Sequence, residues 1–293
     1  MKIIFVGAVK FSASALEELI AMKANVIGVC TTSESSANSD HVNLSSIAQK
    51  AGIPVKLTLR INDPDTLSWI QKLNPDIILC FGWSQLIRKP LLGIPPMGII
   101  GYHPTALPAN RGRHPLIWAL ALGLKETASS FFFMDEGADS GDILSQEPVA
   151  ISPTDDAGSL YQRITTTAMS QIRDFIPQLS EGNYTRVQQD HSQANTWRKR
   201  SIEDGKIDWR MSADSIHNLV RALTHPYVGA HFIHRERLVK VWRTEIENNI
   251  SANFEPGKVL SLSDQGILVK AGTEAIWLCE IDPVTAVETG DYL

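Results

Sequence analysis

The chain of 293 residues has little cysteine and no metal-binding spacing. Its three cysteines, Cys30, Cys80 and Cys279, lie far apart, each in an apolar run, and no CxxC pair occurs. Isolated cysteines in apolar runs are typical of small buried hydrophobic residues in a reducing compartment, which excludes a disulfide-stapled fold. His231 and His234 stand three positions apart with no third ligand, so we expect no metal site.

Long hydrophobic runs and an excess of basic residues are also missing. No stretch approaches the roughly 18 apolar residues that a membrane span needs, and residues 1–7 are too short for a signal peptide. The formal net charge is −5, with 27 Lys and Arg against 32 Asp and Glu. We therefore expect a soluble cytoplasmic protein with neither a membrane nor a nucleic acid as partner.

The first turn lacks the glycines of a dinucleotide site. Residues 7–12 read Gly-Ala-Val-Lys-Phe-Ser, with one glycine where the fingerprint needs three. Without the other two glycines the backbone cannot approach a pyrophosphate, which excludes nicotinamide and flavin cofactors. Lys10 in this turn either binds an anion or is a solvated lysine.

Short apolar runs alternate with amphipathic stretches over the first 180 residues. The runs predict strands over 2–7, 26–31, 53–57, 76–80 and 98–102, and later over 129–134 and 143–149. Helical spacing predicts helices over 12–22, 44–51, 64–73 and 114–122, and a long helix from about residue 154, with Ser12 as the N-cap of the first. This alternation predicts an α/β fold, in which a Rossmann-like, mostly parallel sheet carries helices on both faces.

A polar stretch separates this region from the C-terminal residues. Residues 181–205 are rich in Asn, Gln and Ser and include Arg198-Lys199-Arg200, a pattern typical of a linker. Beyond it, one predicted helix over 212–223 is followed by short runs at 238–242, 257–262, 266–271 and 275–280 with glycine turns. We therefore predict three parts: a domain over 1–180, a linker over 181–205, and a small OB-like β-barrel domain over 206–293.

The residues best suited to chemistry lie between Tyr102 and Gly141. His103 directly follows a predicted strand and begins a turn stiffened by two prolines. Asp139 lies between two predicted strands in the loop Asp-Glu-Gly-Ala-Asp-Ser-Gly, residues 135–141. A histidine beside a carboxylate can transfer protons near neutral pH. Taken singly, each residue also fits a structural role, the aspartate as a turn former.

Together these motifs resemble the formyltransferase family that uses 10-formyltetrahydrofolate, and most closely its sugar N-formyltransferases, which are similar to methionyl-tRNA formyltransferase. The His-Pro-Thr-Ala-Leu-Pro turn and the 135–141 loop match, with Asp139 36 positions after His103. The run Arg111–Trp118 and the C-terminal segments also match, so the resemblance spans the chain. It implies a formyltransferase whose catalytic domain is 1–180, with 10-formyltetrahydrofolate as formyl donor and no metal.

The resemblance also assigns residues. His103 is expected to stabilise the charge on the formyl oxygen and pass a proton to the folate nitrogen, and Asp139 to orient the imidazole. The family has Asn where this chain has Gly101, so the side chain of Asn110, a backbone N–H or a water must replace it. The residues predicted to line the folate pocket are Gln85, Leu86, Ile87, Arg113, Asp135 and Gly137, with Phe81 and Trp83 either as its walls or as core aromatics.

Charge decides the predicted acceptor. Residues 206–293 hold nine Lys and Arg against twelve Asp and Glu, and the loop over 31–43 has no basic residue. Because tRNA binding needs cations, we predict as acceptor the primary amine of a nucleotide-linked amino sugar, contacted by Lys10, Thr105 and Arg111, in polysaccharide biosynthesis. The alternatives are methionyl-tRNA formylation, a folate-binding relative with weakened catalysis, and a formate-releasing hydrolase. A homodimer is also left open.

Overall fold

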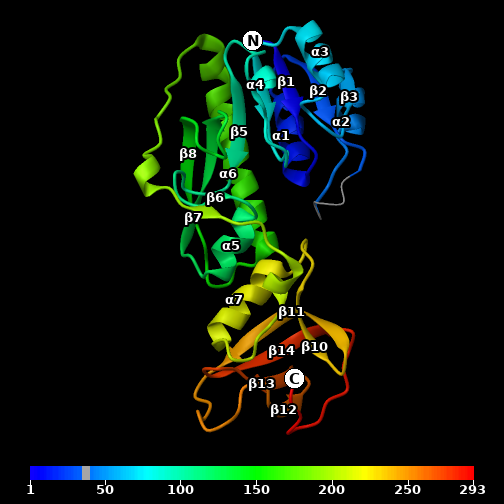
Figure 1. The fold of residues 1–293 in the computed structure, drawn as a ribbon, viewed down its shortest axis with the longest axis vertical. Helices are drawn as coiled ribbons and strands as arrows, with labels where there is room; N and C mark the ends of the chain where they lie inside the picture. The colour runs from blue at the N-terminus through cyan, green and yellow to red at the C-terminus, as the bar shows by residue number, and fades with distance from the viewer. Residues whose placement is uncertain (35–39) are drawn as a thin grey trace. The chain divides into compact units, whose positions relative to one another are not determined.

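The computed structural model describes residues 1–34 and 40–293 and divides the chain into two compact units (Figure 1). The first unit comprises Met1–Pro115, Thr127–Val149 and Gln162–Trp197, and the second Leu116–Glu126, Ala150–Tyr161 and Arg198–Leu293. Residues 35–39, part of the loop used above to predict the acceptor, lie outside the described residues. Within the part described, no helix has the length and apolar character needed to cross a membrane.

A seven-stranded sheet in the order β3-β2-β1-β4-β5-β7-β8 forms the centre of the first unit. Neighbouring strands from β3 to β5 pair in parallel, and β7 runs antiparallel to β5. This confirms the predicted mostly parallel sheet, and each predicted strand lies within a few residues of an observed one. The strands are β1 (Ile3–Val6), β2 (Val26–Thr31), β3 (Val55–Leu57), β4 (Ile77–Cys80), β5 (Ile99–His103), β7 (Glu126–Phe133) and β8 (Ile143–Ala150).

Helices flank this sheet on both faces (Figure 1). Those that lie wholly or mostly in the first unit are α1 (Lys10–Ala21), α2 (Ser45–Lys50), α3 (Pro64–Leu73), α4 (Lys89–Leu92) and α6 (Ala157–Glu181), whereas all but the first residue of α5 (Pro115–Ala121) belongs to the second unit. The N-cap prediction for Ser12 is wrong, because α1 begins two residues earlier and Ser12 is buried inside it. The Ser12 hydroxyl accepts from the Val9 N–H and donates to the Phe81 carbonyl at 2.6 Å, so it joins the turns after β1 and β4.

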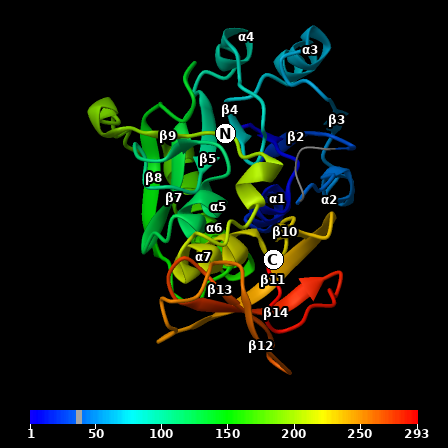
Figure 2. The ribbon, with the colours of Figure 1, turned by 60° about the horizontal axis from the view of Figure 1, so that its bottom comes forward.

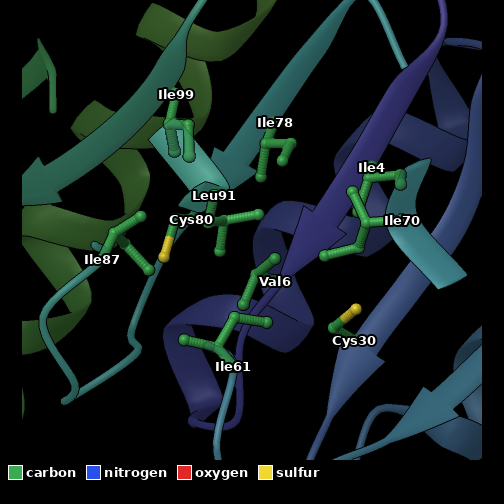
Figure 3. Close-up of a cluster of buried hydrophobic side chains, with 10 residues drawn as sticks. All are labelled: Ile4, Val6, Cys30, Ile61, Ile70, Ile78, Cys80, Ile87, Leu91 and Ile99. Atoms are coloured by element: carbon green, nitrogen blue, oxygen red, sulfur yellow. The ribbon is translucent and has the colours of Figure 1, made fainter. Parts of the chain in front are cut away.

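The alternation of side chains along the strands builds two apolar layers. Ile4 and Val6 of β1 point to one face, where they pack in a cluster with Ile70 of α3 and Leu91 of α4 (Figure 3). Aromatic rings gather in a second cluster, in which Phe81 lies 5.7 Å from Phe5 and 5.1 Å from Phe131, between ring centroids. Phe131 in turn contacts Phe175 of α6 at 4.8 Å. The first layer is apolar, and the second includes the Tyr102 ring, whose hydroxyl lies 3.1 Å from that of Ser129.

The turns after β1 and β4 fill the switch point of the sheet, where strand order reverses. A Cβ on Gly7 would lie 2.5 Å from the Phe81 carbonyl oxygen, and one on Gly82, whose φ is +70°, would lie 2.2 Å from Val9 Cγ2. Dinucleotide-binding sheets receive the pyrophosphate at this position. Here the two turns touch each other instead and occupy that space.

Cys30 and Cys80 are buried in the first apolar cluster (Figure 3). Burial raises the pKa of both thiols to about 12, so few thiolates are available to react. We predict that neither cysteine reacts with Ellman's reagent at mildly alkaline pH in the folded chain, and that both react in guanidinium. Release of three thiol equivalents from the native protein would show instead that this layer opens readily.

The second unit contains a five-stranded antiparallel sheet in the order β10-β11-β14-β13-β12, with α7 (Ala213–Leu223) packed on β11 and β14 (Figure 2). The strands are β10 (Ala230–His234), β11 (Arg237–Glu247), β12 (Val259–Ser263), β13 (Gly266–Lys270) and β14 (Ala275–Asp282). The predicted C-terminal β domain is confirmed. The sequence does not predict β10, because two of its five residues are histidines and a charged turn follows it.

Candidate active site

Two of the predicted catalytic residues meet at the carboxyl edge of the sheet. β5 ends at His103, which is 5% exposed, and Asp139 lies in the loop between β7 and β8. The Nδ1 atom of His103 is 3.6 Å from Oδ2 of Asp139. β7 pairs antiparallel with β5 and ends with Phe133 opposite Ile100, so the loop after β7 must return toward the end of β5 to bring Asp139 to His103. Residues 36 positions apart in the chain therefore form one pair of ionisable groups.

The other ring nitrogen of His103 also has a partner. Its Nε2 atom lies 2.9 Å from the Asn110 carbonyl oxygen, which can only accept, so Nε2 carries a proton. Oxygen atoms thus face both nitrogens of the ring, the Asn110 carbonyl within hydrogen-bonding distance of Nε2 and the Asp139 carboxylate 3.6 Å from Nδ1. Such a ring can donate a hydrogen bond to a developing oxyanion and supply a proton to a leaving group.

Asp139 is held in an unusual backbone conformation by its surroundings. Its φ is +55°, in the left-handed region that aspartate tolerates better than most residues. The Gly112 N–H donates to its Oδ2 atom at 2.9 Å, and the Gln189 amide donates to its carbonyl oxygen at 2.9 Å. A Cβ on Gly141 would lie 1.8 Å from the Phe133 carbonyl oxygen, so the loop needs glycine there.

The same loop is also closed internally by a second carboxylate. Asp135 Oδ1 accepts from the Gly137 N–H at 2.9 Å and from the Ser140 hydroxyl at 2.7 Å. Asp135 and Gly137, both predicted folate contacts, therefore shape the loop in this structure.

Asn110 presents its backbone, rather than its side chain, to His103. Its φ is +64°, which turns the carbonyl toward the ring. The side-chain oxygen accepts from Asn195 Nδ2 at 3.1 Å, and the Asn110 N–H donates to Asn195 Oδ1 at 2.7 Å. In the side chain that was predicted to replace the family asparagine, the amide oxygen thus accepts from Asn195.

The position of that family asparagine is filled by other side chains. A Cβ on Gly101 would lie 2.8 Å from Phe132 Cζ and 2.9 Å from Met134 Cγ, both closer than real Cβ contacts. Residues 132 and 134 come from the end of β7 and the residue after it. The glycine at position 101 therefore fits the large side chains of Phe132 and Met134, which leave no room for an asparagine.

A pocket of about 970 Å³ lies in the first unit and includes three of the predicted folate residues, Gln85, Leu86 and Ile87. Its volume suits a ligand the size of a pterin conjugate. Gln85 donates to the Leu59 carbonyl at 2.5 Å and accepts from the Ile61 N–H at 3.3 Å, so it also joins the two walls. The other lining residues are Leu59, Arg60, Asn62, Asp63, Arg88, Lys89, Pro90 and Glu136.

The remaining predicted folate residues divide between the pocket edge and the core. Arg113 donates to the Ser84 carbonyl at 2.9 Å, directly before the segment that lines the pocket. The indole N–H of Trp83 is buried and has no acceptor among the described residues, so it is free to donate to a ligand. Phe81 is fully buried between Phe5 and Phe131, which makes it a core aromatic.

Of the three predicted acceptor contacts, Lys10 is exposed at the first residue of α1. Thr105 is fully buried and its hydroxyl donates to the Ala109 carbonyl at 3.1 Å. Arg111 is 9% exposed and its Nη2 atom donates to Gln189 Oε1 at 2.6 Å. The hydroxyl and the guanidinium are therefore occupied inside the protein.

The residues that hold these loops come from the segment predicted as a linker. It contains the 3-10 turn His191–Gln193 and β9 (Thr196–Trp197), which pairs in parallel with β6 (Arg111–Gly112). Gln189, which is buried, and Asn195, which is exposed, were missed because polar residues in a stretch without periodicity carry no signal of their contacts. In the part of the chain that the structure describes, no group of three His, Cys, Asp or Glu side chains could hold a metal ion.

Comparison with known proteins agrees with this geometry. The formyl transferase family matches residues 1–175, and the formyl transferase C-terminal domain matches residues 199–288. A methionyl-tRNA formyltransferase of Ruminiclostridium cellulolyticum is 32% identical over 300 residues, which cover 100% of this chain and 96% of that protein. The corresponding protein of Citrifermentans bemidjiense is 31% identical over 299 residues, covering 100% and 93%.

Solved structures show the same fold. An N-formyltransferase from Helicobacter canadensis, in complex with folinic acid and dTDP-3-aminofucose, matches with a TM-score of 0.73 at 17% identity, over 95% of this chain and 99% of that one. Two family domains cover nearly all of the sequence, and relatives above 30% identity align with all of it. The chain belongs to the formyl transferase family, as its resemblance to the 10-formyltetrahydrofolate-dependent enzymes predicted.

Proposed function

We propose that the chain transfers the formyl group of 10-formyltetrahydrofolate to the amino group of methionyl-tRNA. The observation that carries this proposal is the 32% identity over the whole chain to a methionyl-tRNA formyltransferase. The N-formyltransferase structures that match are only 17% to 20% identical and show the fold alone. The relatives thus favour the alternative acceptor over the amino sugar that net charge predicted.

The second unit is acidic in total but has a short basic hairpin between β10 and β11. The turn between β10 and β11 and the start of β11 expose Arg235 and Arg237, with Lys240 half-buried farther along β11 and Glu236 as the one acid among them. The Arg235 side chain is 70% exposed, and its Nη2 atom lies 3.8 Å from Oδ2 of Asp291, a pair that a phosphate would have to compete with. Phosphates respond to the nearby field, so a short basic hairpin can bind them on a unit that is acidic in total.

The pair at the sheet edge fits the chemistry of formyl transfer. The acceptor amine forms a bond to the formyl carbon, the bond from that carbon to the folate nitrogen breaks, and the amine proton ends on that nitrogen. His103 donates a hydrogen bond to the formyl oxygen as its charge grows and relays the proton, after Nε2 exchanges the Asn110 carbonyl for the reactants. Asp139 orients the ring. The formyl carbon of the folate donor is the electrophile, and the pocket lined by Gln85, Leu86 and Ile87 binds the donor.

The test is formyl transfer to methionyl-tRNA, followed as acid-precipitable formyl label. We expect turnover with this substrate. The logarithm of the affinity for tRNA should fall linearly with the logarithm of the salt concentration, with a slope of about −0.9 for each phosphate that the protein neutralises. Arg235→Gln and Arg237→Gln should each lower that slope by about one and raise KM for tRNA with kcat unchanged. Lys50→Gln, an exposed lysine of α2, makes the same change in charge and should leave the slope as it is.

The second candidate acceptor is a nucleotide-linked amino sugar. The twelve acids against nine bases over residues 206–293 favour it, as does a fold shared with a protein bound to dTDP-3-aminofucose. Turnover on dTDP-linked amino sugars with weak salt dependence, and none on methionyl-tRNA, would overturn the tRNA proposal in its favour.

A further inference from the structure

We propose that Gln189 is a positioning residue for formyl transfer and that it acts through Asp139. The proposal rests on the function proposed above, in which His103 and Asp139 are the reacting pair, but not on the choice of acceptor. Gln189 precedes the 3-10 turn His191–Gln193 and lies 50 positions beyond Asp139.

One end of the Gln189 side chain holds the loop that carries Asp139. Gln189 is 4% exposed, and its Nε2 atom donates to the carbonyl oxygens of Asp139 at 2.9 Å and of Gly141 at 2.6 Å. Both amide protons are therefore used on two carbonyls that flank Ser140. These two hydrogen bonds fix the backbone from Asp139 to Gly141, where Asp139 adopts a left-handed conformation.

The other end of the side chain fixes which way the amide points. Its Oε1 atom accepts from Arg111 Nε at 3.2 Å and Nη2 at 2.6 Å. Arginine has only donors, so the oxygen must face it and the NH₂ group must face the loop. Arg111 Nη2 also lies 3.0 Å from His191 Nδ1, which therefore accepts. The buried amide has one satisfied orientation and no alternative.

The same segment also reaches the Asp139 carboxylate. Arg111 and Gly112 form β6, which pairs with Thr196–Trp197, and the Gly112 N–H donates to Asp139 Oδ2 at 2.9 Å. Gln189 thus holds the backbone of Asp139 while its partner Arg111 lies directly before the residue that holds the carboxylate. Loss of one member leaves buried polar atoms unpaired, so the effect spreads through the network.

The expected consequence is a loss of rate without a loss of binding. The carboxylate lies 3.6 Å from His103 Nδ1, and Gln189 does not line the pocket at Gln85. A displacement of about 1 Å at a reacting group can cost on the order of 100-fold in rate. Because the displaced group orients the imidazole, the change should fall on kcat.

The variant that isolates this role is Gln189→Glu. Glutamate keeps the side-chain length and the acceptor for Arg111, but places a second oxygen against the two loop carbonyls. We expect kcat to fall roughly 10- to 100-fold, with KM for donor and acceptor nearly unchanged. Gln193→Glu introduces the same charge on an exposed residue of the same segment and should behave as the unaltered protein.

A double-mutant cycle separates positioning from simple destabilisation. In an Asp139→Asn background, adding Gln189→Glu should cost no further loss of kcat, because both changes act on one group. An equal fold-loss of kcat in both backgrounds, or unchanged kcat in a well-folded Gln189→Glu, would overturn the proposal.

A readout without turnover keeps this result apart from the choice of acceptor. Crystal structures of Gln189→Glu and of the unaltered chain should differ in residues 135–141, with the distance between His103 and Asp139 longer in the variant. An unmoved loop would overturn the positioning role whichever amine is formylated. Failure of methionyl-tRNA as substrate with a displaced loop would overturn only the proposed acceptor.

Discussion

His103→Ala is expected to lower kcat by roughly 10²- to 10⁴-fold, the contribution of a positioned proton donor. The ring lies at the end of β5, and both its nitrogens face oxygens in this structure. Alanine removes the hydrogen bond to the growing charge on the formyl oxygen and the path for the proton. Single-turnover formyl transfer from 10-formyltetrahydrofolate measures the loss.

The fold and the binding of the donor should survive this change. His103 does not line the pocket at Gln85, so calorimetry with folinic acid, which does not react, should give the affinity of the unaltered chain. Asp139→Asn should also lower kcat, because the amide keeps the shape but not the charge that orients the ring. Asp142→Asn, just after the same loop, is its matched control and should have little effect. Near-normal kcat in His103→Ala would remove the histidine from the mechanism.

Gly101→Asn, which restores the asparagine of the family motif, is expected to destabilise the protein without raising its activity. A Cβ at this position lies 2.8 Å from the buried Phe132 ring and 2.9 Å from Met134, so the new side chain overpacks the layer beside β5. Overpacking of this kind costs about 1–3 kcal/mol in the free energy of unfolding. Urea denaturation followed by fluorescence would measure that cost.

A control and a relief variant make this prediction specific. Gly52→Asn should change stability by less than about 0.5 kcal/mol, because nothing lies within 4 Å of its Cβ and asparagine tolerates its φ of +70°. Met134→Ala in the Gly101→Asn background should recover part of the lost stability, since it opens one side of the site. A stable Gly101→Asn protein with higher kcat would show instead that the space is free for the amide.

The chain therefore carries out its chemistry without the amide that the family places two residues before the histidine. Removal of one oxyanion donor from an enzyme costs about 10²- to 10³-fold in kcat. Gly101 has no side chain to donate to the formyl oxygen, so a turnover lower than that of relatives with the asparagine is the expected consequence.

The sequence by itself determined the parts of the protein that depend on neighbours along the chain. Alternating apolar runs predicted the parallel strands, because a strand buried on both faces must be apolar along its length. The position of His103 after such a strand, and the glycine-flanked loop at Asp139, predicted where the pair lies. The single helical turn α4 and the two-residue strands β6 and β9 were missed, since one helical turn shows no repeat and two residues make no apolar run.

Tertiary structure alone decided which polar side chains are free to act. Arg111 and Thr105 look available in the sequence, yet Arg111 is bound by Gln189 from 78 positions away and Thr105 is fully buried. The side chain of Asn195, 85 positions beyond Asn110, donates to the Asn110 amide oxygen. A hydrogen bond depends on positions in space, and the polar spacing of residues 181–205 is the same whether those side chains meet solvent or a buried loop. Net charge likewise describes a whole unit, whereas a phosphate would meet only the few cations of one hairpin.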